Sequence, residues 1–180
     1  MRLLIAAFAI AMLVPSLAMA QDMGAITDYK VREFYKETNE TYKKDFAAFY
    51  KFLDGSLIPN IIATQEVSVR MAGRKPKITT QTLYKKDIMK AARATHKSMT
   101  WADVHTNIYT VEIDPFGRSA LVKSETLIEG MDLQGMPANA RQECIDKLVI
   151  GAVGLMQIAT SDCHTNIDIR PAEMSSQNQH

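Results

Sequence analysis

Apolar residues recur at intervals of three and four between residues 28 and 53, which is the spacing of one face of an α-helix. We therefore predict a helix here with a mainly aromatic buried stripe: Tyr35, Thr38, Tyr42, Phe46, Phe49 and Leu53. The sequence Asp54-Gly55-Ser56 predicts its end, because glycine commonly adopts left-handed geometry after a helix. An apolar connection over residues 57–62 follows.

A second helix is predicted over residues 83–99, with Thr79 or Thr80 as its capping residue. It has two separate stripes at helical spacing. The apolar stripe, which we expect to be buried, consists of Ile88, Ala92, Thr95 and Met99. The basic stripe consists of Lys86, Lys90, Arg93 and Lys97.

The hydrophobic period changes to two after the second helix, which is typical of β-strands. Residues 101–113 and 119–129 predict two strands joined by a turn at Asp114-Pro115-Phe116-Gly117. A loop over residues 130–139 leads to a hairpin over residues 140–169. One short alternating segment, residues 66–71, precedes the second helix and adds a fifth candidate strand.

The predicted hairpin contains both cysteines of the chain. A two-residue loop at Val153-Gly154 would place Cys144 directly opposite Cys163. Opposed residues on antiparallel strands lie ~4.5–5.5 Å apart at Cα, within the range that a disulfide requires. We therefore predict a Cys144–Cys163 disulfide; the alternative is a pair of buried free thiols.

These elements predict one α+β domain, with an N-terminal helix pair packed on a curved antiparallel sheet of four to five strands. In element order and in its FLDGSLIPN helix exit, the segment from Asp28 to Ile169 resembles the nuclear-transport-factor-2-like superfamily, a cone-shaped fold. The resemblance implies a concave sheet on which some relatives, isomerases and cyclases, carry acid–base residues. The rival Bet v 1-like fold closes with a long C-terminal helix, whereas this chain closes with strands.

The first 20 residues have the pattern of a secretory signal peptide. Arg2 precedes an apolar core over residues 3–14, and Ala18-Met19-Ala20 is a small-x-small cleavage site. We expect a mature chain that begins at Gln21, has a flexible start to residue 27 and a disordered tail over residues 170–180. Such a chain would be periplasmic or secreted and would contain no transmembrane segment, and its compartment would permit the disulfide.

The formal net charge of +1 argues against a general nucleic-acid-binding protein. The charge is unevenly distributed, however: from Arg70 to Lys97, nine basic residues accompany a single acid, Asp87. The basic stripe on the second helix could bind an envelope protein or an anionic lipid surface. The alternative is an ordinary solvated helix face.

The strand over residues 101–113 carries the candidate chemistry. Asp103 and His105 share one face with Trp101, Asn107 and Tyr109, a set that a general acid–base site would use. Strand alternation favours the opposite orientation, with the residues on the other face, Val104, Thr106 and Ile108, turned to the core. Trp101 and Tyr109 would then cover the outer face through a partner or a dimer contact.

The sequence contains residues for two further kinds of site. A pocket for a small apolar ligand would use four aromatic residues: Trp101, Tyr109, Phe46 and Phe49. The last strand alternates Asp162, His164, Asn166 and Asp168, but this spacing matches no familiar ligand set, so we expect no metal. No phosphate-binding or dinucleotide motif is present, so we also expect no cofactor.

The patterns indicate a compartment and a shape rather than a reaction. Our first interpretation is an exported, non-enzymatic periplasmic binding or accessory protein that holds a small apolar ligand or an envelope partner. The second is a small cone-fold lyase or isomerase that uses Asp103 and His105. The third is a structural subunit of an envelope or secretion complex.

Overall fold

The computed structural model describes residues 24–71, 75–133, 135, 137–152 and 154–169. The predicted signal peptide, the start of the mature chain at Gln21 and the C-terminal tail lie outside these residues and stay predictions. Three helices and six strands follow one another in the described residues: α3 (Asp28–Lys44), α4 (Phe46–Ser56), β1 (Leu57–Met71), β2 (Lys77–Tyr84), α5 (Lys85–Ser98), β3 (Met99–Ile113), β4 (Ser119–Asp132), β5 (Pro137–Ile150) and β6 (Met156–Ile169).

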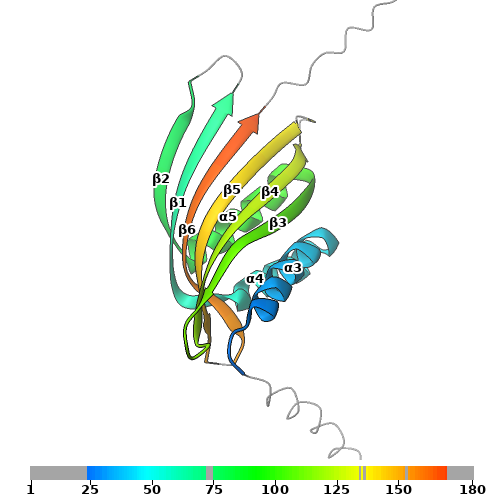
Figure 1. The fold of residues 1–180 in the computed structure, drawn as a ribbon. Helices are drawn as coiled ribbons and strands as arrows, with labels where there is room; N and C mark the ends of the chain where they lie inside the picture. Colours follow the sequence, from blue (N-terminus) through cyan, green and yellow to red (C-terminus); the bar gives the residue numbers. More distant parts are fainter. Residues whose placement is uncertain (1–23, 72–74, 134, 136, 153, 170–180) are drawn as a thin grey trace, which may run out of the picture.

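The six strands form one curved sheet in the order β2-β1-β6-β5-β4-β3. Neighbouring strands are antiparallel except β1 and β6, which are parallel. The helices lie toward one side of this curved sheet (Figure 1). The predicted α+β class is confirmed, with one or two more strands than the sequence indicated.

The first predicted helix is two helices. Asp45 has extended backbone angles, φ −158° and ψ 129°, and separates α3 from α4. Its carboxylate accepts hydrogen bonds from the backbone N–H groups of Ala47 and Ala48 at 3.2 and 3.1 Å, so it is the N-cap of α4. The prediction of one continuous helix over residues 28–53 was therefore wrong, because a capping aspartate interrupts the aromatic stripe.

Three local expectations were also wrong. Gly55 lies inside α4 and does not have a positive φ; Leu57 instead leaves the helix in an extended conformation. Residues 57–62 belong to β1, and Thr79 and Thr80 lie in β2 rather than capping a helix. α5 begins only at Lys85, where the Asp87 carboxylate accepts a hydrogen bond from the Tyr84 N–H at 3.2 Å.

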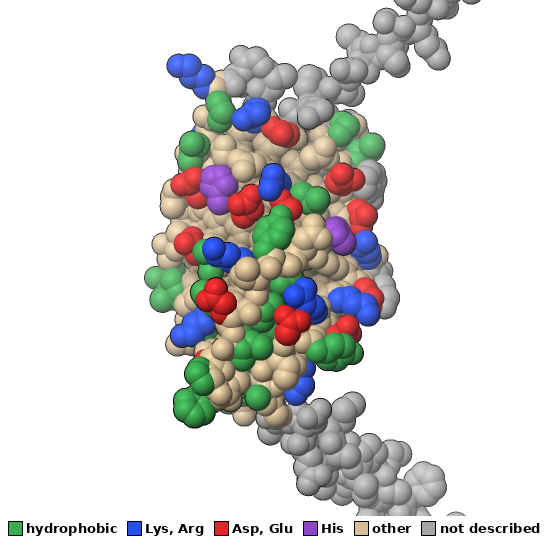
Figure 2. Space-filling view, viewed as in Figure 1, with side chains coloured by type: hydrophobic (Ala, Val, Ile, Leu, Met, Phe, Trp, Pro, Cys, Tyr) green, Lys and Arg blue, Asp and Glu red, His purple; other side chains and the backbone are tan. Residues whose placement is uncertain are grey.

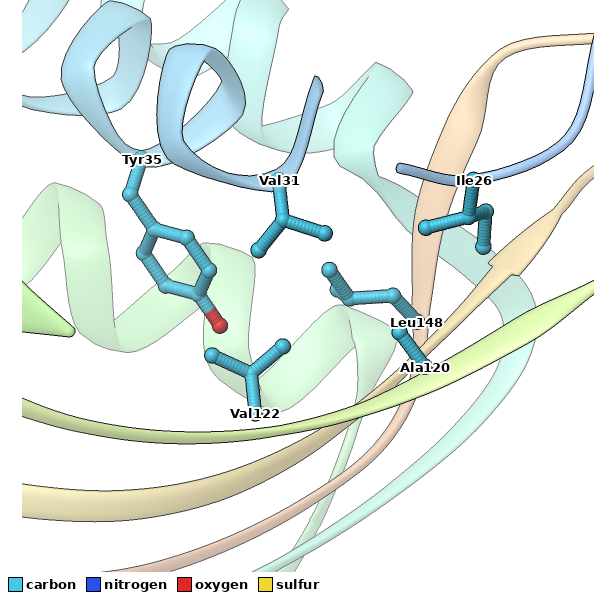
Figure 3. Packing of buried hydrophobic residues seen from close by; sticks show 6 residues of the cluster. All are labelled: Ile26, Val31, Tyr35, Ala120, Val122 and Leu148. Atoms are coloured by element: carbon cyan, nitrogen blue, oxygen red, sulfur yellow. The ribbon is translucent and has the colours of Figure 1, made fainter. Parts of the chain in front are cut away.

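The main core lies between α3 and the middle of the sheet. Val31 and Tyr35 of α3 point onto Val122 of β4 and Leu148 of β5 (Figure 3). Ile26, immediately before α3, and Ala120 complete this cluster. A second buried cluster joins β1 to α5 through Leu57, Ile61 and Met89. The two clusters hold the helices against the sheet at different points, because burying apolar surface is the main stabilising term in folding.

The stapled hairpin has the predicted pairing but a different turn. Cys144 faces Cys163, and their sulfur atoms are 2.06 Å apart. The strands end at Ile150 and begin again at Met156, so the connection spans five residues rather than two. A register shift between Lys147 and Leu148 restores the predicted pairing beyond it. Gly154 has the expected positive φ, 75°.

In the part of the chain that the structure describes, no helix has both the length and the apolar character needed to cross a membrane.

Candidate functional site

A long groove lies between α3, α4 and the hairpin that joins β5 to β6, and we call it the α3–α4 groove. Its volume is about 700 Å³, within the ~300–1,000 Å³ of small-molecule sites. Its apolar lining comes from both helices, the segment before α3 and the hairpin: Ile26, Phe34, Phe52, Ile150, Leu155 and Met156. Its charged rim consists of Lys30, Glu33, Glu37 and Lys51.

The break at Asp45 creates this groove. Because α4 starts a new direction there, Phe34 of α3 and Phe52 of α4 meet with ring centroids 5.8 Å apart. The residues of α3 and α4 that line the groove recur three or four apart, as one face of each helix requires. The Gln157 side chain donates a hydrogen bond to the Gly55 carbonyl at 2.7 Å and ties the end of α4 to β6. The groove is thus part of the packed fold.

Two large residues of the lining are strongly exposed. Tyr29 is 71% exposed and Leu155 is 60% exposed, although both border an apolar surface. Scattered exposed apolar residues are ordinary, but a contiguous apolar patch rimmed by polar residues marks a binding surface. A ligand in the groove would remove these side chains from water.

Of the four aromatic residues predicted to form a ligand pocket, the three whose side chains the structure describes have separate surroundings. Phe46 stacks in parallel on His96 of α5, with ring centroids 3.9 Å apart. Phe49 is buried and contacts Tyr42 edge-to-face at 4.8 Å. Tyr109 is 58% exposed and donates a hydrogen bond to Glu125 at 2.6 Å, and the Trp101 side chain lies outside the described residues. Phe46 and Phe49 pack α4 rather than line the groove.

Asp103 and His105 lie on the exposed face of β3, while Val104 is turned inward and is 8% exposed. The Asp103 carboxylate pairs with Lys43 at 2.6 Å and accepts a hydrogen bond from the Val104 N–H at 2.9 Å. The hydrogen bond from Lys43 is the main cause that holds the pKa of Asp103 below its ordinary value. His105 Nε2 lies 3.0 Å from the Asn107 side-chain oxygen. Because both side chains are exposed, the pair lacks the water-excluded surroundings of a typical acid–base site.

A second groove, of about 460 Å³, lies between α3 and β3, and His105 borders it. Its lining mixes polar and apolar residues, with basic residues of α3 on one wall: Arg32, Lys36 and Lys43. Each of these three has a carboxylate partner, Asp28, Glu33 and Asp103 respectively. The cations are therefore balanced locally, and the groove has no net attraction for an anion.

The sequence reasoning missed a buried acid. Asp146 on β5 is 5% exposed, and its carboxyl oxygens lie 2.6 Å from the Tyr35 hydroxyl and 2.6 Å from the Ser161 hydroxyl. Burial raises the pKa of Asp146 above its ordinary value, since a buried charge is poorly solvated. Burial and the neighbouring Asp146 also raise the pKa of Tyr35. The network anchors α3 to the sheet through polar groups.

The same region contains a cluster with metal-ligating atoms. One ligand atom each of Cys144, Asp146 and Cys163 lie within 4.8 Å of one another. The two sulfur atoms are bonded to each other, however, so neither offers a thiolate. In this oxidised form the cluster does not fit a metal ion.

The basic stripe is exposed along its whole length on α5: Lys86, Lys90, Arg93 and Lys97. Arg93 also lies over the Tyr50 ring, 4.7 Å from its centroid. The inward face of α5 differs slightly from the prediction, since Met89 is buried and Thr95 is exposed. Across the molecule, on the face in view in Figure 2, acidic and basic side chains are interspersed.

Comparison with known proteins identifies the fold. No protein-family model and no curated protein matches the sequence. A conserved protein from Planctomyces limnophilus is similar in structure at 14% identity, covering 77% of this chain and 94% of its own, with a TM-score of 0.56. A type 2 hexachlorocyclohexane dehydrochlorinase (LinA) is similar at 7% identity, covering 80% and 88%, with a TM-score of 0.55.

A putative scytalone dehydratase from Novosphingobium aromaticivorans is similar at 11% identity, covering 77% of this chain and 80% of its own, with a TM-score of 0.50. The chain therefore has the cone-shaped fold of the nuclear-transport-factor-2-like superfamily, as its element order predicted. Identities this low show the fold alone, because one fold hosts many unrelated activities.

Proposed function

We propose that this is an exported, non-enzymatic binding protein whose α3–α4 groove holds a small apolar ligand. The observation that carries the proposal is the groove itself, about 700 Å³ of space with an apolar lining and a charged rim. Concave, mainly apolar sites with a few polar groups at the edge are the usual form of small-molecule sites. Tyr29 and Leu155, both strongly exposed, would gain burial from the ligand.

Export is the second part of the proposal. The sequence pattern of residues 1–20 supports a cleaved signal peptide, and the Cys144–Cys163 disulfide is compatible with an oxidising compartment. In a bacterial cell that compartment is the periplasm. A soluble carrier there would move or sequester an apolar molecule that water alone dissolves poorly.

The test uses a neutral apolar fluorescent dye, N-phenyl-1-naphthylamine, whose emission rises in an apolar site. Ala48 is exposed and lines the groove, so Ala48→Trp should fill it and lower dye affinity at least tenfold. Ala47 is the exposed neighbour outside the lining, so Ala47→Trp is the matched control and should bind like the parent. Equal dye affinity in the two variants, or no binding by the parent, would refute the proposal.

The alternative is a small lyase or isomerase that uses Asp103 and His105. Its support is the fold shared with a dehydrochlorinase and a putative dehydratase, which at 7% and 11% identity extends to the fold only. The exposed position of both side chains favours the binding function. A third candidate, docking to an envelope partner or an anionic lipid surface, is favoured by the uninterrupted exposure of the basic stripe.

A further inference from the structure

The shape of the α3–α4 groove restricts the ligand further. Its lining on α3 runs from Tyr29 to Thr41, which at 1.5 Å per residue is about 18 Å of helix. Spread over that length, the 700 Å³ volume gives a mean cross-section of only about 40 Å². The floor is narrow as well, because Phe34 and Phe52 are in ring contact at 5.8 Å. The space is a trough, longer than it is wide.

Polarity changes across the trough. Its floor is apolar, with Phe34 and Phe52 in the middle and Ile150 and Met156 toward the hairpin. Charged side chains border it over much of its length, with Lys30, Glu33 and Glu37 on α3 and Lys51 on α4. A ligand that matches this arrangement has an apolar tail and one polar head.

The charge of the rim indicates the kind of head. Two acids, Glu33 and Glu37, and two bases, Lys30 and Lys51, border the groove. A head with a single charge would meet like and unlike charges together, whereas a head carrying both charges can pair with both. The rim therefore suits a zwitterionic group better than a bare anion or cation.

We propose that the ligand is a single-chain zwitterionic amphiphile, with one unbranched alkyl tail along the floor of the trough and its head at the charged rim. The inference rests on the proposed function and adds the chemical class of the ligand. Lysophospholipids have this chemistry.

The test is a chain-length series of n-alkylphosphocholines, each measured below its micelle concentration by displacement of N-phenyl-1-naphthylamine. Each added methylene should raise affinity about fourfold, as for burial of one CH₂ group. The gain should stop once the tail is as long as the trough, about 18 Å by the helix rise. A series without this slope, or one that keeps rising for longer tails, would overturn the inference.

Two controls define the class. At equal chain length, the phosphocholine should bind more tightly than the alkyl sulfate and the alkyltrimethylammonium; tighter binding of either singly charged head would overturn the inference. Ala48→Trp should weaken the whole series at least tenfold, and Ala47→Trp should not. If the dye binds but the amphiphiles show no dependence on length, only the chemical class is wrong. If neither dye nor amphiphile binds, the proposed binding function fails as well.

Discussion

Asp146 is a carboxyl group in surroundings that its residue type disfavours. A carboxyl group on the inner face of a sheet loses hydration, and the hydroxyls of Tyr35 and Ser161 replace only part of it. Because its pKa is raised, the Asp146 carboxyl group stays neutral in the folded protein over a pH range in which the same group is ionised in the unfolded chain. Its contribution to stability is therefore complete below the unfolded pKa and is lost as pH rises through the folded pKa.

Asp146→Asn should remove this pH dependence. Asparagine has the same shape, can still accept from Tyr35 and cannot ionise. For the parent, each pH unit between the ordinary and the raised pKa should lower the free energy of unfolding by about 1.4 kcal/mol relative to the variant. Urea unfolding of both proteins from pH 4 to pH 9 measures the difference. Parallel stability profiles would show that Asp146 does not titrate as inferred.

Asp103 and His105 should be dispensable. Because the pKa of Asp103 is lowered, its effect on stability changes with pH in the opposite direction to that of Asp146. The contribution of Asp103 to the free energy of unfolding is present above the unfolded pKa and is lost as pH falls through the folded pKa. Since the pair with Lys43 is exposed, we expect Asp103→Asn and His105→Ala to fold with thermal midpoints close to the parent's and to bind the dye equally. Normally folded variants that lose the protein's biological effect would instead favour the acid–base alternative.

The orientation of side chains on β3 could be predicted from the alternation of apolar and polar residues, whereas the burial of Asp146 could not. Val104 points inward because apolar and polar residues alternate in this strand, which is the signal that period-two patterns contain. Asp146 stands between Ile145 and Lys147, where alternation alone suggests a solvated position. Its partner Tyr35 lies 111 residues away, a distance over which local pattern has no information.

Among the elements, α5 offers the most direct test of an interaction surface. Lys86→Glu with Arg93→Glu should leave the fold intact, because both side chains are exposed and such changes usually alter stability by ~0.5 kcal/mol or less. If the basic stripe binds anionic lipid, co-sedimentation with phosphatidylserine-containing vesicles should fall in the double variant. Lys123→Glu with Lys147→Glu, at two exposed sheet positions, makes the same charge change as a control. Equal loss in both variants would mean that net charge, not the stripe, matters.

The disulfide should stabilise the hairpin chiefly through the unfolded state. For a sequence separation of 19 residues, removing it by Cys144→Ser with Cys163→Ser should cost ~3 kcal/mol. Urea unfolding under non-reducing conditions measures this difference. The parent treated with a reductant is the matched comparison and should lose a similar amount, whereas an unchanged midpoint in both would contradict the estimate.

Element boundaries were predictable where one strong signal acted alone. The turn at Asp114-Pro115-Phe116-Gly117 formed as expected, with the Asp114 carboxylate accepting from the Phe116 and Arg118 N–H groups at 2.8 and 3.0 Å. At Asp45 two signals competed, since the apolar period continues through a residue that is also a good N-cap. The hydrophobic period predicted one helix, but the capping Asp45 divides the segment into α3 and α4. The α3–α4 groove was missed for that reason.

For the whole molecule, element order was enough to predict the cone-shaped fold but not all of its sheet. The pairing of β1 with β6 joins segments about 100 residues apart, as the Gln65–Thr165 hydrogen bond at 3.4 Å illustrates. Nothing local in either strand specifies that parallel contact. In the folded chain, Ile158 of β6 packs against the cluster that Ile61 of β1 and Met89 of α5 share. Topology of this kind emerges from the assembled core rather than from segments.

The exported protein should begin at Gln21, because the apolar core of residues 3–14 is followed by Ala18-Met19-Ala20. The same molecule should contain no free thiol, since an oxidising compartment closes Cys144–Cys163. Intact-mass measurement of the exported protein, with and without thiol alkylation after denaturation, tests both statements in one experiment.

The control is a chain that starts at Gln21 behind an initiator methionine and stays in the reducing cytoplasm. It should take up two alkyl groups, one at each cysteine, because thiols are kept reduced there. A mass that retains residues 1–20 in the exported sample would contradict the signal peptide, and with it the compartment in which we place the ligand-binding function. Two alkylated cysteines in a correctly processed chain would contradict only the disulfide, because processing and oxidation are separate events.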